Sequence, residues 1–196
     1  MILSRYHPML KPIRFVARAR KKSIDSPVLE YVSIETQGDK QYAVCTDEFR
    51  LHRVELTTCI PDGLYMVVKN TQTEVVLDLS MTPCSYYPNT TEMIQRWSYN
   101  KKIASVLLGK IDIAVAQINK RLPGNYGIDY RYVVDVMETI DGDSDVYFNA
   151  EANSTHPILF DNHHGYQAWV MPIEILQEKE EDEEKEEDED VSVTRN

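Results

Sequence analysis

The chain has 196 residues, of which 42% are hydrophobic and 27% charged, a composition typical of a soluble globular protein. Its 32 acidic and 21 basic residues give a net charge of −11 at pH 7, which by itself argues against a nucleic-acid-binding protein. No apolar run approaches the roughly 20 residues that span a membrane, and the first residues lack a signal-peptide pattern. We therefore expect a cytoplasmic protein with no membrane partner.

The first predicted element is a helix over residues 9–22. Met9, Ile13, Val16 and Ala17 recur at helical spacing and define its apolar face. The opposite face is basic throughout, which is unusual because exposed helices gain from mixed charges. The members of this basic stripe are Lys11, Arg14, Lys21, Lys22 and Arg18. The stripe is either a plain solvated face or a surface for an anionic partner.

Short strands come next, recognised by alternating polar and apolar residues and by β-branched and aromatic side chains. They are expected at residues 28–34, 41–45, 50–56, 64–68 and 74–79. A turn at residues 37–39 separates the first two strands. A short helix is expected at residues 90–94, whereas the apolar run 103–118 fits neither helix nor strand clearly.

The same order then recurs in the last third of the chain. Asp129 is placed to cap a helix over residues 130–140, which ends at Gly142. The buried side of this helix is expected to hold Tyr130, Val133, Val134, Met137 and Ile140. Strands are expected at residues 146–148, 157–160 and 166–171. A helix followed by strands, twice, predicts an α+β architecture with helices packed on one face of antiparallel sheets.

Residues that carry chemistry elsewhere are sparse here. Asp161, His163 and His164 are metal-ligand types, but their spacing around Gly165 favours a hairpin turn. Cys45, Cys59 and Cys84 are widely spaced and form no Cys-x-x-Cys pair, so we expect inert thiols rather than a zinc site or disulfides. With no glycine-rich phosphate loop, His-Glu-x-x-His motif or paired carboxylates, we expect no metal, no cofactor and no catalytic residue.

Residues 177–196 form a separate segment with 11 acidic and 3 basic residues, which leaves a net charge of only −3 on the preceding 176 residues. Such a dense block of like charge cannot form a core, so we expect a disordered tail. It is either a solubilising appendage or an electrostatic competitor that covers a basic surface until DNA displaces it.

Three segments together resemble the bacterial DNA polymerase III β sliding-clamp family. Residues 42–51, Tyr-Ala-Val-Cys-Thr-Asp-Glu-Phe-Arg-Leu, are similar to the family's Ala-Thr-Asp-Gly-His-Arg-Leu signature, with Glu48 and Phe49 in place of Gly and His. Residues 127–137 resemble the family's helix entry, Tyr-Leu-Leu-Asp. The family's ending, Pro-Ile-Leu-Ile followed by Tyr-Val-Val-Met-Pro-Met, is similar to two segments of this chain. They are residues 156–160, His-Pro-Ile-Leu-Phe, and residues 166–173, Tyr-Gln-Ala-Trp-Val-Met-Pro-Ile.

The resemblance implies a DNA-clamp fold over residues 1–176, with a divergent central segment at about 57–126, followed by the tail. The family chain has three clamp domains, and this one has the length for one, or for two compressed ones. The resemblance also implies that the basic stripe contacts double-stranded DNA. A hydrophobic pocket for a partner peptide is carried over onto Thr46, Arg50, Leu51, Val170, Met171 and Pro172.

The leading hypothesis is a non-enzymatic processivity factor that holds duplex DNA without reading its sequence and tethers a replicative polymerase. A clamp loader and further copies of the chain are expected partners, and the compact size suggests a phage-type or plasmid-type replicon. The alternative is a clamp-fold interaction module that binds a replisome protein without encircling DNA. A metal-dependent hydrolase is a third hypothesis, weakly supported by the residues.

Overall fold

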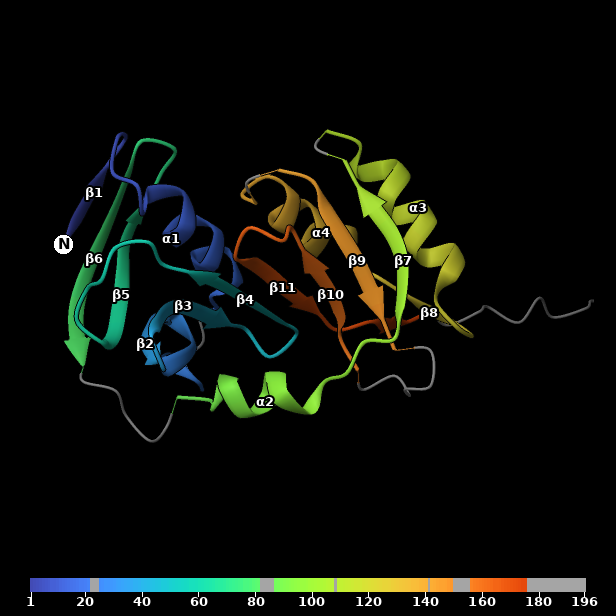
Figure 1. Ribbon diagram of the computed structural model, residues 1–196, viewed down its shortest axis with the longest axis horizontal. Helices are drawn as coiled ribbons and strands as arrows, with labels where there is room; N and C mark the ends of the chain where they lie inside the picture. Colours follow the sequence, from blue (N-terminus) through green and yellow to red (C-terminus); the bar gives the residue numbers. More distant parts are fainter. Residues whose placement is uncertain (22–24, 82–86, 108, 141, 150–155, 176–196) are drawn as a thin grey trace, which may run out of the picture.

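The computed structural model describes residues 1–21, 25–81, 87–107, 109–140, 142–149 and 156–175. Its main feature is one antiparallel ten-stranded sheet with the order β1-β6-β5-β2-β3-β4-β11-β10-β9-β7 (Figure 1). Its strands are β1 (Ile2–Ser4), β2 (Tyr31–Gln37), β3 (Lys40–Thr46), β4 (Arg50–Glu55), β5 (Gly63–Asn70), β6 (Glu74–Met81), β7 (Lys101–Val106), β9 (Ser144–Phe148), β10 (Ile158–Asp161) and β11 (Tyr166–Val170). A second, two-stranded sheet pairs β8 (Tyr126–Gly127) with β12 (Ile173–Glu174). The expected acidic tail, residues 177–196, lies outside the described residues.

The sheet consists of two halves with the same order of elements. In the first half β1 is followed by α1 (Leu10–Val16) and then by β2, β3 and β4. In the second half β7 is followed by α3 (Ile111–Arg121), α4 (Tyr130–Met137) and then by β9, β10 and β11. The halves meet where β4 pairs with β11, with Leu51 opposite Trp169. In the sheet, the β5–β6 hairpin lies between β1 and β2, although it follows β4 in the chain. It has no counterpart in the second half, where β7 and β9 pair directly.

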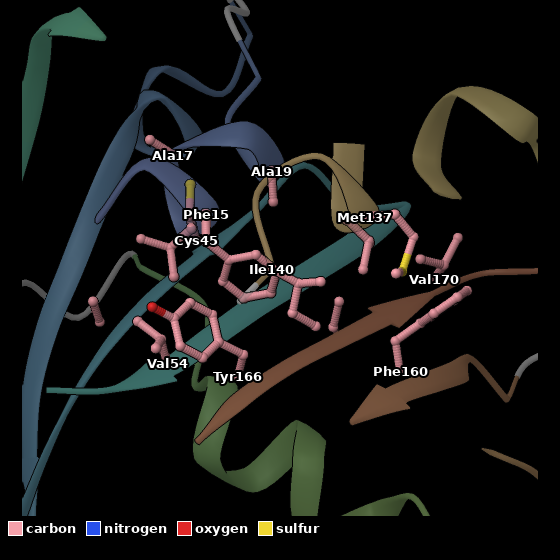
Figure 2. Packing of buried hydrophobic residues seen from close by; sticks show 14 of the residues in the cluster. Phe15, Ala17, Ala19, Cys45, Val54, Met137, Ile140, Phe160, Tyr166 and Val170 are labelled. Carbon is pink, nitrogen blue, oxygen red and sulfur yellow. The ribbon is translucent and has the colours of Figure 1, made fainter. Parts of the chain in front are cut away.

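Helices α1, α3 and α4 lie together on one face of the sheet (Figure 1). Phe15 of α1, Ile140 after α4 and Tyr166 of β11 belong to the main core, which continues across the junction of the two halves (Figure 2). Period-two alternation places Val54, Ala168 and Val170 on this face. The predicted α+β class with antiparallel strands and packed helices is thus confirmed.

Helix α2 (Thr90–Arg96) lies on the opposite face of the sheet (Figure 1). There Ile94 and Trp97 pack against a smaller apolar cluster of Val44, Leu51, Leu159 and Trp169. The cause is again strand alternation, because Leu51 and Trp169 point away from the main core. The Asn89 side chain caps α2 by accepting from the backbone N–H of Glu92 at 3.1 Å.

The first helix is shorter than the expected 9–22. Helix α1 ends at Val16 and continues as the 3₁₀ turn η1 (Ala17–Ala19), after which Arg20 is extended. The backbone N–H of Lys21 donates at 3.1 Å to the carbonyl of Leu29, which lies in the 3₁₀ turn η2 (Pro27–Glu30). This N–H is therefore not used for a helical hydrogen bond. Lys21 therefore lies beyond the helix, and Lys22 lies outside the described residues.

The later elements follow their predicted positions more closely. Asp129 caps α4 as predicted, by accepting from the backbone N–H of Arg131 at 2.8 Å. Tyr130 is 48% exposed, so it does not belong to the buried side of α4, where Val136 is found instead. The stretch 103–118, which the pattern left unassigned, contains most of the strand β7 and most of α3.

The turn between β10 and β11 contains Asp161, His163 and His164, as the hairpin prediction requires. His163 has a φ of 59°, and its backbone N–H donates to the Asp161 carboxylate at 2.7 Å. Over the described part of the chain, no three His, Cys, Asp or Glu side chains are grouped to hold a metal ion. None of the described helices is both long and apolar enough to cross a membrane.

Candidate functional site

The turn between β3 and β4 organises the junction of the two halves. The Thr46 hydroxyl donates to the Arg50 carbonyl at 2.7 Å, and Asp47 Oδ1 accepts from the backbone N–H groups of Phe49 and Arg50 at 3.1 and 2.9 Å. Glu48 has a φ of 78°, a region that favours glycine. The sliding-clamp signature has Gly at this position. The turn therefore keeps the backbone conformation that glycine favours, although the residue is a glutamate.

The Arg50 guanidinium connects this turn to both helices of the junction. Its Nε donates to Asp47 Oδ2 at 2.9 Å, its Nη1 to Asp135 Oδ2 at 2.5 Å, and its Nη2 to the Arg18 carbonyl at 2.7 Å. The guanidinium also stacks 4.6 Å from the ring centroid of Tyr132. Only 9% of the Arg50 side chain is exposed, so these contacts are made out of bulk water. Arg50 thus holds the halves together.

An apolar groove lies beside the same turn, on the face covered by α2. Leu51 and Trp169, which are paired across β4 and β11, form its floor, and both are 2% exposed. Phe49, at the rim, is 52% exposed. The groove is lined by Thr46, Glu48, Phe49, Arg50, Leu51, Met93, Trp97, Pro157, Trp169 and Met171.

Four of the six residues expected to form the peptide pocket line this groove, namely Thr46, Arg50, Leu51 and Met171. Val170 does not, because it is fully buried in the main core on the opposite face. Pro172 does not line it either and precedes β12. The predicted pocket did not include Trp169, Met93 of α2, or Trp97, which directly follows α2. Met93 and Trp97 are four positions apart, the spacing that places two side chains on one face of a helix. Trp169 precedes Val170 in β11, so strand alternation points it to the opposite face.

Three members of the basic stripe, Lys11, Arg14 and Arg18, lie on α1 and the 3₁₀ turn η1 that follows it. Lys11 is exposed, whereas Arg14 and Arg18 are partly covered. Arg18 lies 3.4 Å from Asp135 and 3.5 Å from Glu138, both of α4 or its end, and Lys21 Nζ lies 2.7 Å from Glu48. Arg18 and Lys21 are therefore engaged in ion pairs within the chain.

Two buried titratable side chains lie near the junction. His52 is fully buried, stacks on Phe15 with 4.6 Å between ring centroids, and has Nδ1 2.8 Å from the Phe15 carbonyl. Burial lowers the pKa of His52 to about 3. Burial likewise raises the pKa of the Cys45 thiol to about 12. Both groups are held neutral inside the core, which fits structural rather than catalytic roles.

The element order, the continuous sheet and the helical face define the fold of the DNA polymerase sliding clamps. The sliding clamp of Bacillus subtilis matches with a TM-score of 0.60 at 14% identity, over 90% of this chain and 64% of that one. The DNA polymerase III β subunit of Thermotoga maritima matches with a TM-score of 0.61 at 9% identity, over 91% of this chain and 65% of that one. The Pseudomonas aeruginosa clamp matches with a TM-score of 0.60 at 12% identity, over 89% and 66%.

These likenesses establish the fold. The chain spans just under two thirds of the length of these clamps. No protein-family profile matches the chain, and no curated protein does.

Proposed function

We propose that the protein is a compact, non-enzymatic clamp that tethers a replicative polymerase to double-stranded DNA. The observation that carries this proposal is the apolar groove at the β4–β11 junction. The fold brings together the turn at residues 46–51 and the end of β11, the two segments on which the resemblance implies a peptide-docking pocket. A short hydrophobic peptide is the partner that such a groove accommodates.

The groove is narrow in the unbound protein. It encloses about 30 Å³, close to the volume share of a single water molecule. A peptide side chain therefore needs Met93, Met171 or Trp97 to move. Methionine suits this role because its unbranched side chain changes conformation at low cost. Phe49, already 52% exposed, supplies apolar surface at the entrance.

Duplex DNA is proposed to lie along the face of α1, α3 and α4. Lys11, Arg14, Arg18 and Lys21 provide cations there, and contacts from such side chains to phosphates hold DNA independently of its sequence. Arg18 and Lys21 exchange an intramolecular carboxylate for a phosphate when DNA binds. The expected affinity is therefore moderate for a single copy of the chain.

Self-association is proposed to supply the rest of a ring. The sheet ends at β1 on one side and at β7 on the other, and in the described part of the chain neither strand has a second neighbour. Edge strands with unpaired backbone groups can pair with another chain. Ile2, 65% exposed on β1, is consistent with such an edge contact. A clamp loader would then be needed to open the ring around DNA.

The alternative is an interaction module that binds a replisome protein through the groove but does not encircle DNA. It is favoured by the ion pairs of Arg18 and Lys21, which neutralise part of the basic stripe. Under this alternative the groove has the same partner, and only the DNA role is lost.

One experiment separates the two functions. The mass of the protein is measured by light scattering with and without nicked circular DNA, and its retention on that DNA is followed before and after linearisation. A ring-sized oligomer that stays on the circle and leaves the linear DNA supports the clamp. A monomer that binds a clamp-binding peptide but ignores both DNA forms supports the interaction module. Absence of peptide binding would refute both.

A further inference from the structure

A second, larger cavity lies on the helical face, away from the apolar groove. It has a volume of about 440 Å³ and is enclosed by three separate segments. Arg14, Arg18 and Arg20 come from α1 and the residues that follow it, and Asp135 comes from α4. Asn70, Thr71 and Gln72 come from the tip of the β5–β6 hairpin.

The positive charge of this cavity is not balanced by its single carboxylate. Asp135 Oδ2 lies 2.5 Å from Arg50 Nη1, whereas Arg18 is held only by longer contacts of 3.4 and 3.5 Å to Asp135 and Glu138. Arg18 can therefore turn toward another anion while Asp135 keeps its closer partner. Arg14 forms no ion pair among the described residues. Arg20 donates to the Val67 carbonyl at 2.8 Å through Nη1, which leaves its other donors available.

The hairpin tip adds neutral donors to these cations. Within the described residues, the side-chain amides of Asn70 and Gln72 make no hydrogen bond. The Thr71 hydroxyl is engaged, since it donates to the Glu74 carbonyl at 3.0 Å and accepts from the Glu74 N–H at 3.1 Å. These two hydrogen bonds hold Thr71 against Glu74 at the hairpin tip. The side-chain amides of Asn70 and Gln72 can then donate to a ligand in the cavity.

We propose that this cavity binds a phosphate group. Convergent guanidinium groups match the several acceptor oxygens of a phosphate, and arginine is the side chain best suited to that geometry. The tip of the β5–β6 hairpin lines one side of the cavity, opposite the arginines that follow α1. The second half of the sheet has no corresponding hairpin between β7 and β9. The phosphate belongs either to the DNA backbone, in which case the inference rests on the proposed function, or to a free nucleotide.

The test uses the full chain and inorganic pyrophosphate, titrated by calorimetry, followed by competition with a short duplex. Arg14→Gln, and separately the pair Asn70→Ala with Gln72→Ala, should each weaken pyrophosphate binding about tenfold, equivalent to about 1.4 kcal/mol. Arg14→Lys should restore part of the affinity. Lys120→Gln, which removes an exposed cation on α3 outside the cavity, is the matched control and should leave the affinity for pyrophosphate unchanged.

The outcomes distinguish the sources of the phosphate. Competition between duplex and pyrophosphate assigns the cavity to the DNA backbone. Pyrophosphate binding without competition by duplex assigns it to a free nucleotide, and DNA binding by the proposed clamp then stands or falls separately. If pyrophosphate does not bind with one-to-one stoichiometry, or if the hairpin variants bind it as tightly as the parent, the cavity is not a phosphate site, whatever the protein does with DNA.

Discussion

Arg50 Nη1 lies 2.5 Å from Asp135 Oδ2, a contact that joins β4 to α4 across 85 positions of the chain. The two residues belong to different halves of the sheet, and both side chains are largely shielded from water, with exposures of 9% and 24%. The ion pair therefore fixes the halves next to the groove that they form together.

We expect Arg50→Ala to destabilise the protein by roughly 3 kcal/mol. The substitution leaves the carboxylates of Asp47 and Asp135 without their shared partner in a shielded site, and removing one member of such a pair is costly. Urea unfolding measures the change. Arg131→Ala is the matched control: its ion pair with Asp129 involves a side chain that is 82% exposed and screened by water, so its loss should cost far less than the loss of Arg50. Equal effects of the two substitutions would contradict the role of Arg50.

His52 should make the stability depend on pH. Its pKa of about 3 in the folded protein lies below the ordinary value near 6.5, so the unfolded chain binds more protons between these values. Stability is therefore lost as the pH falls from 6.5 toward 3, by about 1.4 kcal/mol per pH unit from this group alone. In urea titrations from pH 7 to 4, His52→Asn should flatten this dependence. An unchanged slope in His52→Asn would contradict this role of His52.

The groove prediction concerns Phe49 and Met171. Replacing either by Ala should weaken binding of a clamp-binding-type peptide by about 1–2 kcal/mol, because both contribute apolar surface to the groove. Leu51→Ala should weaken it too, but Leu51 is 2% exposed, so this variant also loses stability. Leu79→Ala is the control, as Leu79 is 51% exposed on β6, away from the groove. Unchanged affinity in the Phe49 and Met171 variants would place docking elsewhere.

The basic stripe should determine how DNA binding depends on salt. Lys11→Ala and Arg14→Ala should each lower the slope of log affinity against log salt by roughly one unit, without altering sequence preference. Arg18→Ala should have a smaller effect than Arg14→Ala, because Arg18 already pairs with Asp135 and Glu138. The measurement is binding to a nicked circle over a range of salt concentrations. Identical slopes in all three variants would mean that the stripe is only a solvated face.

Removal of the acidic tail after Leu176 should tighten DNA binding, most strongly at low salt, if the tail competes for the basic surface. Its 11 acidic residues offer more negative charge than the stripe has positive charge. Binding is compared between full-length and truncated protein at two salt concentrations. An unchanged affinity would leave the tail only a solubilising role.

Local patterns in the sequence were sufficient for most elements of this fold. Alternation in residues 41–45 and 50–56 predicts β3 and β4, since a half-buried strand must alternate its side chains. Asp129 predicts the start of α4, because a cap satisfies backbone donors within the next residues and needs no distant partner. The resemblance around residues 46–51 located the turn beside the groove.

Only the tertiary structure decided where those elements act. Helix α1 ends at Val16 and its 3₁₀ turn at Ala19, after which the backbone N–H of Lys21 donates to the Leu29 carbonyl. Within that turn the Arg18 carbonyl accepts from Arg50, which is 32 positions away in the chain. The β4–β11 pairing places Leu51 beside Trp169 and so creates an apolar surface on one face of the sheet. Trp97 packs on this surface, and this contact determines which face α2 covers. Long-range pairing is not encoded in any local period, so only the tertiary structure revealed that Trp169, Met93 and Trp97 complete the groove and that the tip of the β5–β6 hairpin faces the arginines of the cavity.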